Sequence, residues 1–408
     1  MKQTKKLAEK WKYGVMLNLY LAQSIPMTFF STVLPVIMRE NHFSLTSIGL
    51  IQLIKLPWLL KFLWAPIVDF SQGDINKYKK WIIASEVIYA LSIFSIAFFN
   101  LQVDFKLIVI LLLIAFTASA TQDIATDAFS YLVLKKEERS IGGSVQTVGN
   151  FLGAVIGSGL LLIIYYYFGW KTLIVSLALF VLIALIPLWL YKPKQKIQKD
   201  RGIKKMEFKD LFRFFYQPYM KYRIALLFFL YWGIVGILVM LKPWMVDLGY
   251  SIKEIGIYSG IIGPAFGVIF ALVAGKVIKH KGSKFFLSLL LSLYVLINLY
   301  FIYISHKTPS YVEIQIGIMA IWGVYSMTTV FIYSFLMNSI RDGKEGTDFT
   351  LQIVLSHLGS LIIAVLSGKL AHAFGYSGLF NMSFVISLIL FIIIPVLYKK
   401  SLQYEISS

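Results

Sequence analysis

Ionisable side chains occur inside long apolar runs of this sequence, where ion-pair or proton-transfer chemistry could take place. Lys55 and Lys61 lie in one run, Glu86 in the next, and Asp123 and Asp127 in a third. A charge in an apolar helix is costly and usually faces the interior of a helix bundle. The four-residue spacing puts both aspartates on one helix face. Because burial disfavours ionised carboxylates, each acid is a candidate proton carrier or ion-pair partner.

The second half of the sequence offers one more ionisable candidate and a set of aromatic rings. His357, inside a late apolar run, could carry a proton or simply form a hydrogen bond within the packed interior. Tyr231, Trp232, Trp322 and Tyr325 could stack on a ligand, face lipid or belong to the core. Both sets of alternatives stay open at this point.

The residue content argues against enzyme chemistry and metal binding. The chain has no cysteine and five histidines, and the histidines do not cluster with acids in any apolar run. No spacing typical of a serine hydrolase, a metal site or a nucleotide-binding P-loop occurs. We therefore expect no catalytic residue, no metal and no cofactor, and an ATP-driven pump is excluded. A membrane-bound acyltransferase is the enzyme alternative, and nothing in the sequence favours it.

The apolar content predicts an integral membrane protein. Of the 408 residues, 58% are hydrophobic and 14% are charged, whereas a soluble chain is typically about 25% charged. A helix needs about 20 mostly apolar residues to cross a bilayer. Twelve such runs occur, at about 13–37, 45–68, 80–99, 107–130, 141–165, 171–191, 223–246, 252–277, 284–304, 313–339, 349–371 and 377–397.

Lysine and arginine gather in alternate connections between these runs, which predicts the orientation. The basic connections include the N-terminus, the loop at 77–80 and the long linker 192–222. By the positive-inside rule, both termini face the cytoplasm. The net charge of +19 is therefore a topology signal and not evidence of nucleic-acid binding. We expect an N-terminal six-helix bundle (1–191), a basic cytoplasmic linker (192–222) and a C-terminal six-helix bundle (223–408).

The two predicted halves resemble each other. Pro35 and Ser44 recur, with nearly the same spacing, as Pro243 and Ser251. Two six-helix halves related by an axis along the membrane normal form the layout of the major facilitator fold. We therefore predict an all-α integral membrane protein with that fold and twelve transmembrane helices.

The predicted helices also suggest a contact between two charges. Lys61 and Asp123 each lie about 17 residues, or roughly 25 Å, from the outer end of their helix, so they share a depth. An ion pair between them could be structural, could exchange partners between inward-open and outward-open states, or could contact substrate or a proton. Lys55, nearer mid-membrane, is the better candidate for an anionic substrate group, although burial could leave it neutral.

Small residues predict one close helix contact. Gly149, Gly153 and Gly157 repeat every fourth residue in the run 141–165. Such a series lets another helix backbone approach closely in a membrane. We expect these glycines to serve helix packing.

Three stretches of the sequence resemble a known family. They are KLPWLLKFLWAPIVD at 55–69, TQDIATDA at 121–128 and GTDFT at 346–350. They resemble the AmpG-type permeases, a group that includes the bacterial muropeptide permease and the acetyl-CoA transporters. The residues of the last two stretches are similar to those of the siderophore-importing branch. The two extra C-terminal helices of the better-known muropeptide permeases do not occur here.

This resemblance implies a transporter of the bacterial cytoplasmic membrane, coupled to the proton gradient. The facilitator motif between the second and third helices survives in part, and Asp69 at its start would serve the cytoplasmic gate. The Gly-Pro motif of drug/proton antiporters is missing from the fifth helix, which favours import. Asp123, Asp127, Glu86 and His357 are the groups that could carry the proton.

Our main hypothesis is secondary active import of a bulky polar solute, a siderophore or similar, by alternating access. A muropeptide permease of the AmpG type is the alternative within the same class. A non-transporting assembly or receptor protein on the same fold is the alternative from another class, because fold does not fix function. The expected partners are a small-molecule solute and membrane lipids, with no nucleic acid, and we expect a monomer.

Overall fold

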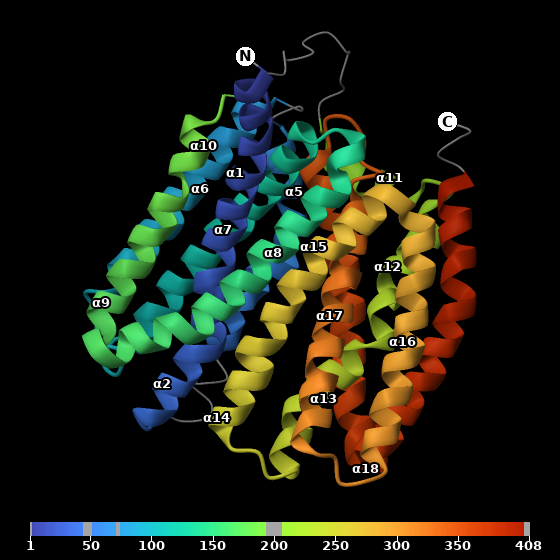
Figure 1. Ribbon diagram of the computed structural model, residues 1–408. Helices are drawn as coiled ribbons and strands as arrows, with labels where there is room; N and C mark the ends of the chain where they lie inside the picture. Colours follow the sequence, from blue (N-terminus) through green and yellow to red (C-terminus); the bar gives the residue numbers. More distant parts are fainter. Residues whose placement is uncertain (1, 44–50, 71–73, 193–205, 404–408) are drawn as a thin grey trace. The chain divides into compact units, whose positions relative to one another are not determined.

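Helices make up nearly all of the computed structural model (Figure 1). The residues that it describes are 2–43, 51–70, 74–192 and 206–403. Ser44, which belongs to the repeat seen in the sequence, and residues 193–205 of the predicted linker 192–222 lie outside the described residues.

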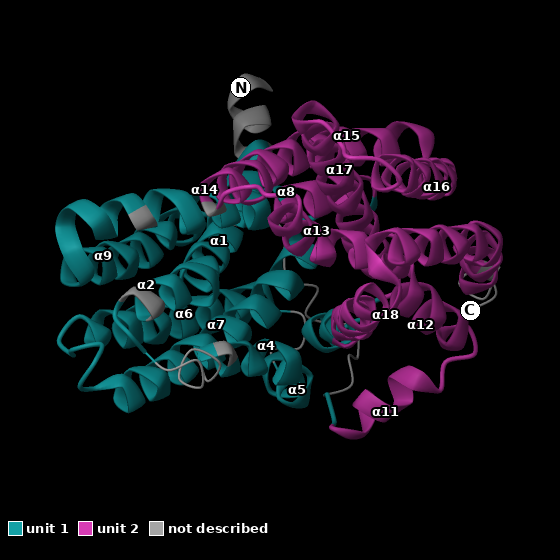
Figure 2. Ribbon diagram, turned by 90° about the horizontal axis from the view of Figure 1, so that it is seen from below, with its two compact units in different colours: residues 1–136, 148–207, 340–350 teal, residues 137–147, 208–339, 351–408 magenta. Residues whose placement is uncertain are grey.

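The chain forms two compact units, each described by itself below (Figure 2). Unit 1 comprises residues 1–136, 148–207 and 340–350. Unit 2 comprises residues 137–147, 208–339 and 351–408. Two helices pass from one unit into the other, namely α8 (Arg139–Val155) and α18 (Glu345–Gln403). The domain bounds expected from the sequence follow the chain order instead, and they stay a prediction.

Unit 1 is built around α6 and α7, which pack along each other, and α1 and α9 pack against them. Aromatic side chains of α6, α7 and the segment η1 that follows α1, such as Tyr89, Phe116 and Phe30, are buried in its core. The helical segments of this unit, besides parts of α8 and α18, are α1 (Lys2–Thr28), η1 (Phe29–Val33), α2 (Leu34–Glu40), η2 (Ile51–Lys55), α4 (Leu56–Leu60), η3 (Lys61–Leu63), α5 (Ala65–Asp69), α6 (Ile75–Ile96), α7 (Phe105–Val133), η5 (Ile156–Leu160), α9 (Leu161–Ala184) and α10 (Ile186–Leu190). The short η4 (Lys136–Glu138) lies at the boundary between the two units.

Unit 2 is built around α15 and α17, and α16 packs against α17. Rings such as Tyr294, Phe286 and Phe331 are buried between these helices. The helical segments of this unit, besides parts of α8 and α18, are α11 (Lys209–Phe215), α12 (Met220–Phe229), η6 (Leu230–Gly233), α13 (Val235–Asp247), α14 (Ile252–Ile255), η7 (Gly256–Ile262), α15 (Gly263–Lys281), α16 (Ser283–Ser305) and α17 (Tyr311–Leu336).

Two of the predicted spans are broken rather than continuous helices. The described part of the span 45–68 is a chain of short α and 3₁₀ segments from η2 to α5. Pro57 and Pro66 explain these breaks, because proline removes an amide donor and its ring clashes with the preceding turn. The span 223–246 is interrupted at η6, after which Ile234 leaves helical geometry (φ −137°, ψ −31°).

Two glycines mark the places where consecutive helices bend sharply. Gly169 in α9 and Gly375 in α18 have positive φ angles of 75° and 68°, which residues with a Cβ rarely adopt. Gly375 divides the 59 residues of α18 between the predicted spans 349–371 and 377–397. The helix α18 therefore comprises two helical parts that meet at Gly375.

The described residues contain eight helical stretches that are long and apolar enough to cross a membrane. Together with the helical content, they confirm the all-α integral membrane class. The count of twelve spans and the cytoplasmic location of the termini stay predictions. The eight stretches are Lys10–Met38, Phe105–Val133, Ile163–Leu190, Met220–Asp247, Lys253–Lys281, Ser283–Ser305, Tyr311–Leu336 and Glu345–Leu402.

Three segments, η1, η5 and η7, are π-helical turns within otherwise α-helical stretches. In η1 the amide of Leu34 donates to the carbonyl of Phe29, five residues earlier. In η5 the amide of Leu161 donates in the same way to Ile156. A π turn thus holds one residue more than an α turn, and such turns are frequent at functional sites.

The glycine series of the fifth predicted span lies against α1. A Cβ atom at Gly149 would lie 2.7 Å from the Cβ of Tyr20, and one at Gly153 would collide with Ser24. At Gly157 a Cβ would lie 2.6 Å from a backbone oxygen of α1. The Ser24 hydroxyl donates to the carbonyl of Gly149 at 3.0 Å. Absence of side chains on these three residues therefore permits backbone-to-backbone approach.

We expect Gly153→Ala to lower the stability of the protein by about 1–3 kcal/mol, since overpacking a tight contact costs that much. Thermal unfolding of the purified protein in detergent measures the change. Gly14→Ala is the matched control, because a Cβ there meets no atom within 4 Å and alanine favours a helix. Equal melting temperatures for the two variants would contradict the close contact.

Candidate functional site

A buried ion pair lies at the centre of unit 1. The Lys61 ammonium of η3 contacts the Asp123 carboxylate of α7, and the two side chains are only 2% and 5% exposed. The same ammonium lies 5.1 Å from the centre of the Trp58 ring, a cation–π distance. The indole of Trp64 donates to the Thr121 hydroxyl at 3.0 Å and ties the broken second span to α7. The break at η3 therefore presents the lysine to the aspartate.

The second aspartate of α7 is hydrogen-bonded to the first helix. The Tyr20 hydroxyl donates to Asp127 at 2.8 Å, and both residues are buried. Eight residues before this tyrosine, the ammonium of Lys12 lies 3.4 Å from the carbonyl of Val133, the last residue of α7. A cation there satisfies a free C-terminal carbonyl and opposes the helix dipole. These two contacts fix α1 along α7.

Unit 2 repeats this pair of contacts with different chemistry. Arg223 of α12 is fully buried, and its guanidinium donates to the carbonyl of Phe335 in the last turn of α17. Tyr231 follows eight residues later, and its hydroxyl lies 3.1 Å from that of Thr329, six residues before Phe335. Asp127 also lies six residues before the capped carbonyl of its own helix. The two units thus share a frame, in which an acid of unit 1 corresponds to a neutral hydroxyl of unit 2.

A third acid of unit 1 belongs to a chain of side-chain amides. Gln23 of α1 donates to the amide oxygen of Gln122, and the Gln122 amide nitrogen donates to Glu86 Oε2 at 3.1 Å. Glu86 is 1% exposed, and its other oxygen has no hydrogen-bond partner among the described residues. The chain links α1, α7 and α6 without an ion pair.

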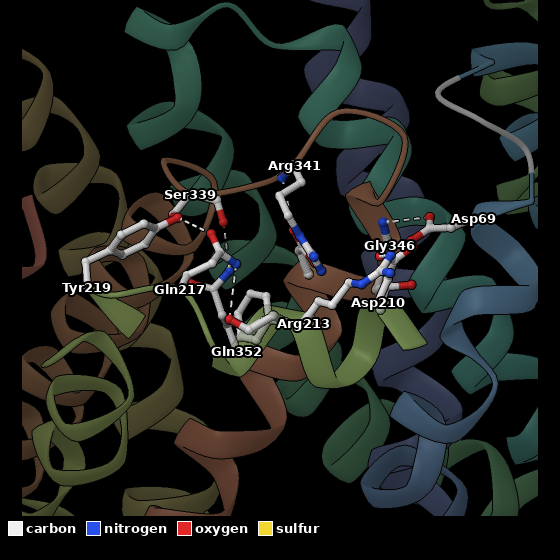
Figure 3. Close-up of polar contacts among 12 residues, drawn as sticks. Asp69, Asp210, Arg213, Gln217, Tyr219, Ser339, Arg341, Gly346 and Gln352 are labelled. Atoms are coloured by element: carbon white, nitrogen blue, oxygen red, sulfur yellow. Dashed lines mark hydrogen bonds and ion pairs between the residues drawn. The ribbon is translucent and has the colours of Figure 1, made fainter. Parts of the chain in front are cut away.

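Asp69, the last residue of α5, caps the N-terminus of α18 within unit 1 (Figure 3). The amides of Gly346 and Thr347 donate to its two oxygens at 2.9 and 2.6 Å, and the Tyr78 hydroxyl donates at 2.7 Å. A helix N-terminus stabilises a negative charge through its free amides and its dipole. Asp69 lies outside the candidate spans, and burial raises its pKa to about 7, although the bonds from Thr347 and Tyr78 lower it.

Polar residues also join α12, α17 and α18 in unit 2 (Figure 3). Gln352 accepts from Arg223 at 2.5 Å and donates to the carbonyl of Ser339 at 3.3 Å. The Ser339 hydroxyl in turn lies 3.1 Å from that of Tyr219. This network holds the connection between α17 and α18 in place.

The aromatic residues expected at the substrate site fall into two groups, both in unit 2. The rings of Tyr231 and Tyr325 lie 5.5 Å apart, and that of Trp322 lies 5.9 Å from Tyr325. Trp322 packs onto Gly263 at the start of α15, where an added Cβ would lie 2.5 Å from the indole nitrogen. Trp232 instead packs against neighbouring phenylalanines of its own helix. The structure therefore separates Trp232 from the other three rings.

Two other predicted site residues, Lys55 and His357, lie at exposed positions. Lys55, at the end of η2, is exposed and forms no ion pair with the described residues. His357 lies on an exposed part of α18. Their proposed roles in substrate binding and proton transfer stay predictions.

Several residues of these clusters were not singled out from the sequence. Arg223 gives no distinct signal, because basic residues are common at the cytoplasmic ends of membrane helices. Gln122 lies inside the quoted stretch TQDIATDA, next to Asp123, but an amide carries no charge signal. Tyr20 and Tyr78 give no signal at all, since tyrosine is common in such runs.

Comparison with known proteins shows relatives that match over most of this chain. A family profile described as Major Facilitator Superfamily matches residues 16–364. The Anhydromuropeptide permease of Escherichia coli K12 is 22% identical over 406 residues, covering 96% of this chain and 80% of that protein. Putative transporter AmpG 4 of Rickettsia felis is 23% identical and covers 93% of this chain and 95% of its own length. These relatives confirm the resemblance to AmpG-type permeases.

Solved structures share the fold. The human organic anion transporter MFSD10 superposes with a TM-score of 0.76 at 15% identity, covering 95% of this chain and 99% of that chain. The major facilitator transporter FucP, in its outward conformation, gives a TM-score of 0.72 at 14% identity, with 97% and 99% covered. At such low identity the likeness concerns the fold alone, and it confirms the major facilitator fold.

We expect Asp123→Asn to destabilise the protein by about 3–5 kcal/mol, because Lys61 is then left buried without a counter-charge. Thermal unfolding in detergent measures the loss. The double variant Lys61→Met with Asp123→Asn removes both charges and should recover most of the stability. If the single and double variants have the same melting temperature as the wild type, Lys61 and Asp123 do not form a buried ion pair.

Proposed function

Because the chain belongs to the major facilitator superfamily, we propose that it imports an anhydromuropeptide or a similar sugar–peptide into the cytoplasm. Its family makes it a multi-pass transporter of small-molecule solutes in the cytoplasmic membrane and not an enzyme. One observation carries the choice of solute: the similarity to a permease named for anhydromuropeptides extends over 96% of this chain. That support favours the muropeptide alternative over the siderophore that the sequence motifs suggested.

The aromatic cluster of unit 2 supports a solute that contains sugar rings. Trp322 and Tyr325 are partly exposed, so their rings can contact a solute. Tyr231 is buried and supports the ring of Tyr325 from behind. Apolar faces of sugar rings stack on aromatic side chains, whose large rigid surfaces lose little entropy on binding. Lys55, which is exposed, is the candidate for a carboxylate of the peptide part.

Coupling to the proton gradient is the second part of the proposal. Secondary transporters of this fold place coupling groups near the middle of the membrane. Among the candidates, Asp123, Asp127 and Glu86 are buried and within hydrogen-bond distance of other side chains. Asp69 would act as a gate residue. Both of its hydrogen bonds to the N-terminus of α18 would form together and break together as a gate closes and opens. A monomer in contact with lipids remains the expected state.

We expect purified protein in liposomes to take up labelled anhydromuropeptide, and to take up more when an inward proton gradient is imposed. Labelled ferric siderophore, supplied in a parallel assay, should not enter. Empty liposomes and a collapsed gradient are the controls. Siderophore uptake without muropeptide uptake would overturn the choice of solute. Uptake of neither would overturn the transport proposal for both solutes.

We expect Gly263→Ala to raise the KM of muropeptide uptake about fivefold with little change in kcat, since it displaces Trp322 and stacking is worth about 1 kcal/mol. Gly260→Ala is the matched control, because a Cβ there meets no atom within 4 Å. Initial uptake rates at several solute concentrations separate the two constants. An unchanged KM in Gly263→Ala would remove Trp322 from the binding site.

A further inference from the structure

Glu86 is a buried acid without a counter-charge. It lies near the middle of the 22-residue helix α6 and is 1% exposed. Its Oε2 accepts one hydrogen bond, from Gln122, and its Oε1 accepts none from the described residues. The other buried acids of unit 1 are better satisfied: Asp123 has Lys61, and Asp69 accepts from two backbone amides.

The charges around Glu86 do not compensate it either. The charged residues of α7 are Lys106, in its first turn, Asp123, which pairs with Lys61, and Asp127, which accepts from Tyr20. On α9, which also packs against α6, the only charged residue is Lys171, and it is exposed. Tyr89, one turn along α6, is a neutral and buried neighbour. An ionised carboxylate with a single hydrogen bond costs far more in such surroundings than a neutral acid does. These surroundings of Glu86 therefore favour its neutral, protonated form over the ionised one.

The amide chain gives this proton a way to influence other helices. Gln122 directs its amide nitrogen to Glu86 and its oxygen to Gln23. When the glutamate is ionised, this orientation is stabilised, whereas a protonated glutamate can donate to the amide oxygen if Gln122 turns over. Turning it over also breaks the bond from Gln23 on α1. That helix is bonded to α7 through Tyr20 and Asp127 three residues earlier.

We propose that Glu86 carries the coupling proton, and that Gln122 and Gln23 transmit its protonation state to α1. The inference rests on the proposed proton-coupled import. Binding and release involve only the transfer of one proton to and from the carboxylate. Asp123 and Asp127, by contrast, act as fixed partners of Lys61 and Tyr20 in this scheme.

Transport measurements on Glu86→Gln separate coupling from folding. Glutamine keeps the shape of the neutral acid and cannot lose a proton. We expect the variant to exchange labelled for unlabelled muropeptide across liposomes at close to the wild-type rate, with loss of accumulation driven by a proton gradient. Ser85→Ala, a buried neighbour on the same helix, should retain both activities. Gradient-driven accumulation by Glu86→Gln would overturn the proposal.

Infrared difference spectroscopy tests the same residue without any solute. The purified wild type, compared between mildly acidic and mildly alkaline buffer, should show carbonyl bands of protonated carboxylic acids, Asp69 contributing one of them, and Glu86→Gln should lack the band that Glu86 contributes. Unchanged carbonyl bands in the variant would overturn the assignment to Glu86. If the band disappears as expected but wild-type liposomes exchange no muropeptide, the titrating site stands and the proposed solute fails.

Discussion

Unit 1 depends on one constraint: each charged side chain buried in its apolar interior needs a partner that compensates the charge. An ion pair inside an apolar bundle is tolerated only when geometry is good and remaining polar atoms are satisfied. The break of the second span at η3 gives Lys61 its position against Asp123. The end of the same span at α5 directs Asp69 to the amides of α18. A continuous helix between these two residues would have to satisfy both contacts at one fixed rotation, and the short segments relax that requirement.

The repeated frame explains how two similar units can divide the work. In each unit a cation, Lys12 or Arg223, caps the C-terminal end of a long helix, α7 or α17, and a tyrosine eight residues after the cation bonds to that same helix. The partner of Tyr20 is the acid Asp127, whereas the partner of Tyr231 is the hydroxyl of Thr329. Charge chemistry therefore concentrates in unit 1 and aromatic surface in unit 2, on one shared scaffold.

The sequence predicts the helical class, the close helix contact at the glycine series and the contact of Lys61 with Asp123. Hydropathy defines the length of each membrane helix, and the helical rise gives the depth of each residue in it. It does not predict the interruption of the second span, since a proline in a membrane helix is sometimes accommodated without a break, nor that of the seventh span, where η6 contains no proline. Tyr20 and Arg223 escape as well, because their importance depends on which helices are neighbours. The choice between siderophore and muropeptide rested on short motifs, and these identify the superfamily branch better than the cargo.

The three π turns indicate where the helices of this chain can accommodate a change in length. Each of η1, η5 and η7 accommodates a surplus residue while the flanking backbone keeps its hydrogen bonds. A bulge of this kind is what remains when one residue is inserted into an α-helix and absorbed locally. Membrane helices are usually expected to tolerate substitutions but not changes of length. In this chain, single-residue deletions at those turns would restore plain α-helix, so lineages of different helix length can share one architecture.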